Sequence, residues 1–194
     1  MAKLVNRKIK LVVVGDRTVG KLISYATGTF LERFRQTVYG NYEACMEIDN
    51  VQVSLSLIDT PWTEDYERLR PLFYPSTDVF LLCFSVDNNT SYKNITTKWY
   101  PQIRKFCPTT PVILVGTKTD LRENAEGQSK DKFISRMQGK KLALKIRAAK
   151  YVEFSAKEIN GVKEVFEEAV RAYMAPNISE TTNSHIRNHQ CKLL

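Results

Sequence analysis

Apolar and polar residues follow each other along this chain in blocks that predict a sheet with helices between its strands. The segments KIKLVVV (8–14), DVFLLCFSV (78–86) and PVILVGT (111–117) are nearly continuous apolar runs, which is typical of strands covered on both faces. YVEFS (151–155) reads as a short last strand. Ala44–Ile48 and Val51–Ile58 are predicted to be two strands that pair across a tight turn at Asp49 and Asn50.

Helical spacing of apolar residues appears between these strands. In the last such segment, apolar residues recur every three or four positions from Val162 to Tyr173, which indicates a helix that packs on the core. The predicted helices are Leu22–Thr27, Glu64–Leu72, Ser91–Lys105, Phe133–Ala149 and Val162–Tyr173. Strands that alternate with helices predict an α/β fold with a mostly parallel sheet, which binds ligands at the carboxyl ends of its strands.

Composition narrows the class without changing this picture. The chain has 194 residues, 43% of them hydrophobic and 26% charged, as expected for one soluble globular domain. Its four cysteines lack the spacing of a disulfide framework or a metal site, which fits a reducing cytosol. Its net charge is +8, and residues 128–150 hold eight Lys or Arg against one Asp. That stretch is either a solvated helix face or a patch for acidic lipid or an acidic partner. The chain has no basic motif with regularly interleaved aromatic residues, so we expect no nucleic-acid partner.

The stretch GDRTVGKLIS (15–24) comes directly after the first apolar run. It nearly matches the phosphate-binding loop G-x-x-x-x-G-K-[ST], in which backbone N–H groups and a lysine hold phosphates. Leu22 stands where that pattern has Ser or Thr. The predicted phosphate loop comprises Gly15, Asp16, Arg17, Thr18, Val19, Gly20, Lys21 and Leu22.

Two further loops follow predicted strands and indicate which base is bound. TKTD (117–120) follows PVILVG, and SAK (155–157) follows the last strand. A carboxylate at Asp120 could accept two hydrogen bonds from the N1 and N2 edge of guanine, and adenine offers no such pair of donors. An ordinary turn would explain TKTD alone, but three loops at three strand ends favour a guanine nucleotide.

These motifs, with longer segments around them, resemble the Rho/Rac family of Ras-like small GTPases. The resemblance rests on FRQTVYGNYEA (34–44), EDYERLRPLFYPSTDVFLLCFSV (64–86) and KWYPQIRKFCPTTPVILVGTKTDLR (98–122). It implies a Ras-like P-loop GTPase fold, with a six-stranded, mostly parallel sheet and about five helices. It also implies a GTPase domain over residues 1–175 and a flexible tail over residues 176–194.

The resemblance assigns roles to particular residues. The base pocket would comprise Phe30, Thr117, Lys118, Asp120, Ser155, Ala156 and Lys157. Switch I, which binds effector proteins, would comprise Thr37, Val38, Tyr39, Gly40, Asn41, Tyr42 and Glu43. Switch II would begin with Asp59, Thr60, Pro61, Trp62 and Thr63. GTP or GDP would be the bound cofactor, with Mg²⁺ held weakly through Thr37 and Asp59.

The chain departs from the family at the phosphate end of this site. Aligning LISY (22–25) with the same letters of the family's loop places a three-residue deletion after Lys21, which removes the magnesium-binding Thr. Arg17 replaces a glycine, Trp62 another glycine, and Thr63 the glutamine that orients the attacking water. We therefore expect guanine recognition with inefficient hydrolysis. Two hypotheses stay open: a signalling GTPase that cycles slowly, and a non-cycling pseudo-GTPase that presents switch I to effectors.

The chain ends in CKLL, which resembles a prenylation box in which the final Leu favours geranylgeranylation of Cys191. The tail before it lacks the family's polybasic run, so membrane attachment is expected to be weak. The resemblance further implies exchange factors and Rho-type dissociation inhibitors as partners. We expect a monomer on the cytoplasmic face of a membrane, with a role such as signalling to the actin cytoskeleton.

Overall fold

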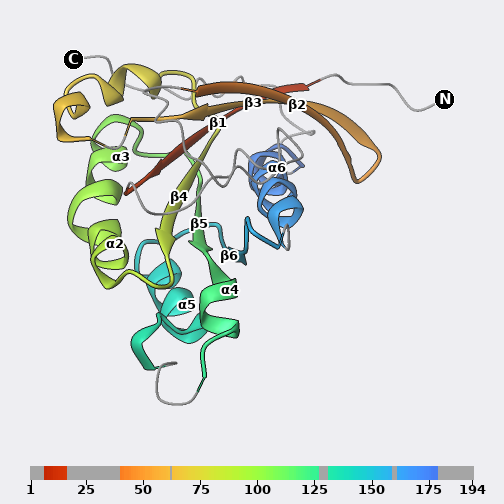
Figure 1. The fold of residues 1–194 in the computed structure, drawn as a ribbon. Coiled ribbons are helices and arrows are strands. Elements are labelled where there is room, and N and C mark those ends of the chain that lie inside the picture. Colours follow the sequence, from red (N-terminus) through yellow and green to blue (C-terminus); the bar gives the residue numbers. More distant parts are fainter. Residues whose placement is uncertain (1–6, 17–39, 62, 127–130, 159–160, 179–194) are drawn as a thin grey trace.

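The computed structural model describes residues 7–16, 40–61, 63–126, 131–158 and 161–178. Its centre is a six-stranded sheet with the strand order β2-β3-β1-β4-β5-β6 (Figure 1). All neighbouring strands pair in parallel except β2 and β3. The predicted α/β fold with a mostly parallel six-stranded sheet is confirmed. The strands are β1 (Arg7–Gly15), β2 (Gly40–Ile48), β3 (Val51–Asp59), β4 (Val79–Ser85), β5 (Val112–Thr117) and β6 (Lys150–Phe154).

The predicted hairpin between β2 and β3 is confirmed. Ile48 pairs with Val51, and the two residues between them, Asp49 and Asn50, have φ angles of 50° and 63°. Two successive positive φ angles are what a two-residue hairpin turn requires, and Asp and Asn tolerate them well. β2 begins at Gly40, four residues earlier than the sequence indicated, and pairs with β3 as far as Asp59.

The predicted segments Ser91–Lys105, Phe133–Ala149 and Val162–Tyr173 are helical in place but not always in type or length. The helix Thr119–Glu123 was not predicted, and the predicted helix Leu22–Thr27 lies outside the described residues. The helices are α2 (Asn89–Asn94), a π-helical turn (Ile95–Trp99), α3 (Tyr100–Phe106), α4 (Thr119–Glu123), α5 (Arg136–Lys145) and α6 (Val162–Ile178). α6 runs past residue 175, the expected end of the domain. No helix in the described part of the chain has both the length and the apolar character needed to cross a membrane.

The prediction of a helix over Glu64–Leu72 is wrong. Two short 3-10 turns, Glu64–Tyr66 and Arg70–Phe73, take its place. Pro71 lies in the first turn of the second one and has no N–H to donate to a helix. The Arg70 side chain donates to the backbone oxygens of Pro61 and Thr63, which holds the chain back toward β3.

Two hydrophobic cores lie on the two faces of the sheet. α6 covers one face, and α2, α3 and α5 cover the other (Figure 1). Residues 11–14 of β1 point alternately into the two cores, which explains why this strand is apolar at successive positions. Because β1, β3, β4, β5 and β6 run in the same direction, their carboxyl ends meet at one edge of the sheet, where the candidate site lies.

Candidate functional site

The loops after β5 and β6 meet at the carboxyl edge. Asp120 lies in α4, directly after β5, and its side chain is only 5% exposed. The Ser155 hydroxyl, which follows β6, donates a hydrogen bond of 2.7 Å to Asp120 Oδ1. Lys118, between β5 and α4, adopts the left-handed conformation with φ 62°. Its Nζ atom lies 3.5 Å from Asp87 Oδ2, an ion pair. The structure thus brings TKTD and SAK together, as the sequence predicted, and fixes the orientation of the Asp120 carboxylate.

The first two residues of the predicted phosphate loop contact β4 and the helices beside it. At Gly15 a Cβ atom would lie 2.5 Å from the backbone oxygen of Cys83, so only glycine allows β1 to approach β4 this closely. The next side chain, Asp16, points to the helical layer. Its Oδ1 accepts the indole N–H of Trp99 at 2.8 Å, and its Oδ2 accepts the side-chain N–H of Asn94 at 2.8 Å. The Asp16 carboxylate therefore anchors the loop, and its two oxygens are engaged by protein donors.

Switch II is held to the rest of the protein by the Thr60 side chain and by two backbone oxygens. The Thr60 hydroxyl donates to the backbone oxygen of Val13 in β1 at 2.7 Å. The Arg70 guanidinium, which is fully buried, donates to the backbone oxygens of Pro61 at 2.8 Å and Thr63 at 3.0 Å. The Thr63 hydroxyl is buried and has no hydrogen-bond partner among the described residues. Switch II is consequently fixed at both ends of the segment in which the chain departs from the family pattern that it resembles.

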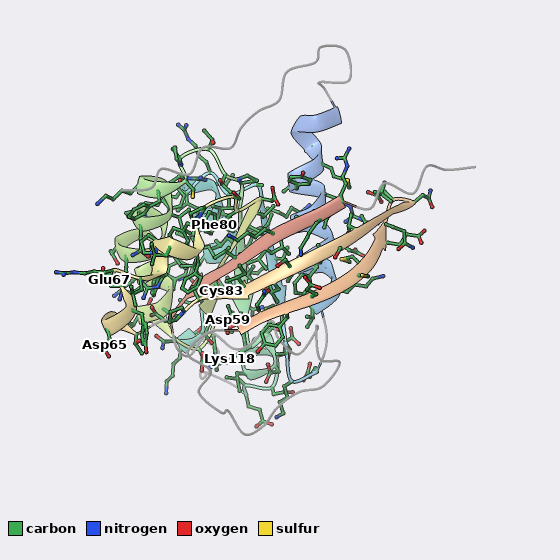
Figure 2. The ribbon with its side chains drawn as sticks, turned by 90° about the horizontal axis from the view of Figure 1, so that it is seen from above. Asp59, Asp65, Glu67, Phe80, Cys83 and Lys118 are labelled. Atoms are coloured by element: carbon green, nitrogen blue, oxygen red, sulfur yellow. The ribbon has the colours of Figure 1, made fainter. Side chains whose placement is uncertain are left out.

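Asp59 ends β3 beside the phosphate loop. It pairs with Val13 of β1 and with Gly40 of β2, and Figure 2 shows it with Lys118 at the same end of the sheet. Burial raises the pKa of the Tyr42 hydroxyl and of the Cys83 thiol, and the nearby negative charge of Asp59 raises both pKa values further.

A magnesium ion fits this donor set if most of its ligands come from outside the protein. In the described segments no three His, Cys, Asp or Glu side chains gather in a way that could hold a metal. Mg²⁺ is commonly held by one or two protein oxygens together with substrate phosphates and water. Asp59 is the described side chain that would serve it, and Thr37 lies outside the described residues.

Comparison with known proteins decides the family. The model of the Ras family matches residues 10–175. The Ras-like GTP-binding protein RhoL of Drosophila melanogaster is 47% identical over 170 residues, which cover 86% of this chain and 87% of that protein. The chain belongs to the Ras family. The resemblance to Ras-like small GTPases is thereby confirmed, and membership in the Ras family implies binding of GTP and GDP.

The Ras-family site has a supporting network that the sequence reading missed. Arg122 donates to both carboxylate oxygens of Glu153, at 3.0 and 2.7 Å, and to the backbone oxygen of Ile134 at 2.9 Å. The Tyr151 hydroxyl donates to the same carboxylate at 2.7 Å. Burial alone would raise the pKa of Glu153, but these hydrogen bonds lower it below its ordinary value. The network fastens the end of α4 to β6 and thereby holds the Asp120 loop beside the Ser155 loop.

A second missed feature links the phosphate loop to switch II. The Arg70 guanidinium lies 4.6 Å from the centre of the Trp99 ring, whose N–H holds Asp16. A cation over an indole ring is attracted to its π electrons, and the attraction is stronger where water is excluded. Gln102 of α3 accepts hydrogen bonds from both Arg70 and Tyr74. Burial lowers the pKa of Arg70, yet a guanidinium keeps its proton in proteins, so this is a buried cation.

Several predicted residues of the Ras-family site lie outside the described residues. These are Arg17, Thr18, Val19, Gly20, Lys21, Leu22, Phe30, Thr37, Val38, Tyr39, Trp62 and Cys191. Gly40, Asn41, Tyr42 and Glu43 of the predicted switch I form the first residues of β2. Ala156 packs against the core under α6, and Lys157 is exposed.

Proposed function

We propose that this chain is a Rho-type signalling protein that selects guanine nucleotides and hydrolyses GTP poorly. The proposal rests on two features at the carboxyl edge of the sheet. The TKTD and SAK segments are joined by a hydrogen bond, and switch II differs from the family pattern. The buried bond between Ser155 and Asp120 prepares a carboxylate for the base. In switch II, Thr63 replaces glutamine. The likeness to RhoL, which is described as a Ras-like GTP-binding protein, favours the Rho branch.

Guanine selection follows from the chemistry of Asp120. Its carboxylate is 5% exposed, and one oxygen already accepts the Ser155 hydroxyl. Guanine offers N1–H and N2–H to such a carboxylate, whereas adenine presents an unprotonated N1 and would leave it unpaired. An unpaired buried charge costs several kcal/mol in binding free energy. We therefore expect the wild-type protein to prefer GDP over ADP.

Poor hydrolysis follows from Thr63. The side chain in this position has to orient the attacking water in the family's mechanism. A threonine side chain is shorter than glutamine, and the Thr63 hydroxyl is buried without a hydrogen-bond partner among the described residues. Its backbone oxygen accepts from Arg70, which keeps this residue near α3. When bound, Mg²⁺ would neutralise negative charge on the phosphates, and Asp59 and Thr37 would help to hold it.

The test is the nucleotide that the purified protein carries. Chromatography of the released nucleotide distinguishes GDP, GTP and none, which indicate hydrolysis, a GTP-locked state and a pseudo-GTPase respectively. Binding of labelled GDP and ADP is then compared in the wild type and in Asp120→Ala, with Asp65→Ala as a control at an exposed carboxylate. Equal binding of GDP and ADP by the wild type would contradict base selection. Rapid single-turnover hydrolysis would contradict the proposed loss of catalysis.

We also propose that effectors bind at the exposed edge of β2. This strand ends the sheet on one side, and Asn41 and Glu43 are exposed on it. An edge strand has backbone N–H and C=O groups that can pair with a partner. Leu69 and Leu72 after switch II are 47% and 63% exposed, which adds an apolar surface for effectors, exchange factors or dissociation inhibitors.

Membrane attachment through geranylgeranylation of Cys191 is part of the same proposal. The support is the terminal CKLL. The preceding residues 176–190 contain one Glu and one Arg, whose charges cancel, so this segment provides no basic cluster. A single lipid usually needs a second signal for stable anchoring. We expect the wild type to divide between cytosol and membrane in fractionated cells, and Cys191→Ser to be soluble. If Cys191→Ser stays on membranes as the wild type does, the lipid is not the anchor.

A further inference from the structure

α5 has a cationic exposed surface, and its Arg136 contributes to lowering the pKa of the nearby Glu153. Four exposed side chains, Arg136, Lys140, Lys141 and Lys145, project from its ten residues, and the helix has no Asp or Glu. Within the described ranges, none of the four forms an ion pair. Four of the eight cations in the stretch 128–150 are therefore exposed on α5 without an ion pair among the described residues.

The spacing of these positive charges destabilises the helix. Arg136 and Lys140 are four residues apart, and so are Lys141 and Lys145. Like charges at this spacing repel each other along a helix. Arg136 also lies in the first turn, where the helix dipole disfavours a cation. An external anion would relieve both effects.

Two exposed apolar side chains lie in the middle of this cationic face. Met137 is 61% exposed and Leu144 is 79% exposed. They are seven residues apart, which is about two turns, so they lie in one line along the helix. With about 100° between successive residues, Lys140 falls on one side of this line and Lys141 on the other. The opposite side of α5 is its core face, formed by Gly139, Leu142, Ala143 and Ile146.

We propose that this α5 face, comprising Arg136, Met137, Lys140, Lys141, Leu144 and Lys145, docks on an anionic lipid bilayer. An apolar line flanked by cations is suited to the interface of a bilayer, where apolar side chains enter the headgroup region and lysines extend to the phosphates. A protein partner fits less well, because lysine is depleted in the buried centre of protein interfaces. The contact rests on α5 alone, so it requires neither the lipid at Cys191 nor bound nucleotide.

The experiment uses the full chain made in bacteria, which carries no prenyl group. Sedimentation with vesicles of phosphatidylcholine, or of phosphatidylcholine with 30% phosphatidylserine, measures binding. We expect binding to the anionic vesicles only, and weaker binding at high salt. Lys140→Gln with Lys141→Gln should weaken it about 25-fold, or about fivefold for each charge near the surface. The control, Lys93→Gln with Lys105→Gln, removes the same charge from α2 and α3 and should bind as the wild type does.

Leu144→Gln separates insertion from charge attraction. It should reduce binding to anionic vesicles while leaving the melting temperature unchanged, because this side chain is outside the core. If the wild type ignores anionic vesicles, or if the α5 and control variants bind them equally, the proposal is wrong. If the α5 variants keep vesicle binding but lose retention on a polyglutamate column, the surface takes an acidic polypeptide instead. Guanine binding and hydrolysis are measured separately, so failure here does not affect the proposed function.

Discussion

Trp99 is the residue whose change should loosen the phosphate loop. Trp99→Phe removes the N–H that donates to Asp16 Oδ1 at 2.8 Å but keeps an aromatic ring beneath Arg70. Trp99 is 1% exposed, so water has little access to replace the lost donor. A hydrogen bond to a charged group contributes about 1.5–3 kcal/mol to stability. We therefore expect the free energy of unfolding to fall by about 2 kcal/mol, with an additional loss from the smaller ring.

A double-mutant cycle with Asp16→Ala isolates the hydrogen bond from the change in ring size. The two single variants and the double variant are unfolded in urea. Because both single variants break the same contact, their effects should fail to add by about 1–2 kcal/mol. Release of a fluorescent GDP analogue should also become faster in Trp99→Phe, since among the side chains that the structure describes only Asn94 then still donates to the Asp16 carboxylate.

Phe84→Leu is the matched control. Phe84 is fully buried in the same core as Trp99, and its ring packs on Tyr92 and Tyr151 instead of the phosphate loop. Phe84→Leu should lower stability without changing GDP release. Additivity of Asp16→Ala and Trp99→Phe within about 0.3 kcal/mol would show that the two sites act independently and would refute the reasoning.

Three further predictions concern the packing around the site. Gly139→Ala should lower stability by about 1–3 kcal/mol, because its Cβ would lie 2.1 Å from the Tyr151 ring; an unchanged thermal melt would contradict this. Glu153→Gln should destabilise the protein at pH 7, and the difference from wild type should shrink below about pH 4. The folded-state pKa of Glu153 is lowered, so the stability it confers is present above the unfolded pKa and lost as the pH falls through the folded one. An equal difference at pH 7 and pH 3, in urea unfolding, would show that the bond to Arg122 is not its source. Arg70→Lys should cost about 1–3 kcal/mol, because an ammonium cannot match the planar fork of donors, and should make switch II more sensitive to proteolysis.

The sheet could be predicted from the sequence because its strands are buried on both faces. A strand such as β4, with all seven residues buried, is apolar from Val79 to Phe84, and the hydroxyl of its last residue, Ser85, donates a hydrogen bond to Asp87. The positions of TKTD and SAK were predictable for a similar reason, since both directly follow strands that are easy to recognise. The direction of the strands then required Asp120 and Ser155 to lie at one edge.

The part of the site that the sequence did not reveal depends on contacts between distant residues. Arg68 and Arg70 are two positions apart in RLR, yet Arg68 is exposed and Arg70 is fully buried. Nothing in the local pattern distinguishes them, because the acceptors of Arg70 lie in switch II and in α3. The 3-10 turns in place of the predicted helix have the same origin.

One boundary was readable in the sequence and was missed. α5 begins after Ser135, which forms a capping box with Gln138, although the helix was predicted from Phe133. Ser followed three residues later by Gln is a recognised start signal for a helix. The π-helical turn Ile95–Trp99 had no such signal, and it lies where Trp99 reaches Asp16. Turns of this kind are frequent at functional sites.

If hydrolysis is impaired as proposed, the contacts of Arg70 explain how switch II keeps its position without the residues that hydrolysis requires. Arg70 donates to the backbone oxygens of Pro61 and Thr63, and every amino acid provides such an oxygen. Substitution at these two positions therefore leaves the acceptors in place, and the buried guanidinium still stabilises the same path of the chain. Catalysis, in contrast, depends on a side chain, and Thr63 has neither the length nor an exposed hydroxyl to replace glutamine. A partner that recognises the surface of switch II would thus find the same surface whether or not the protein hydrolyses GTP efficiently.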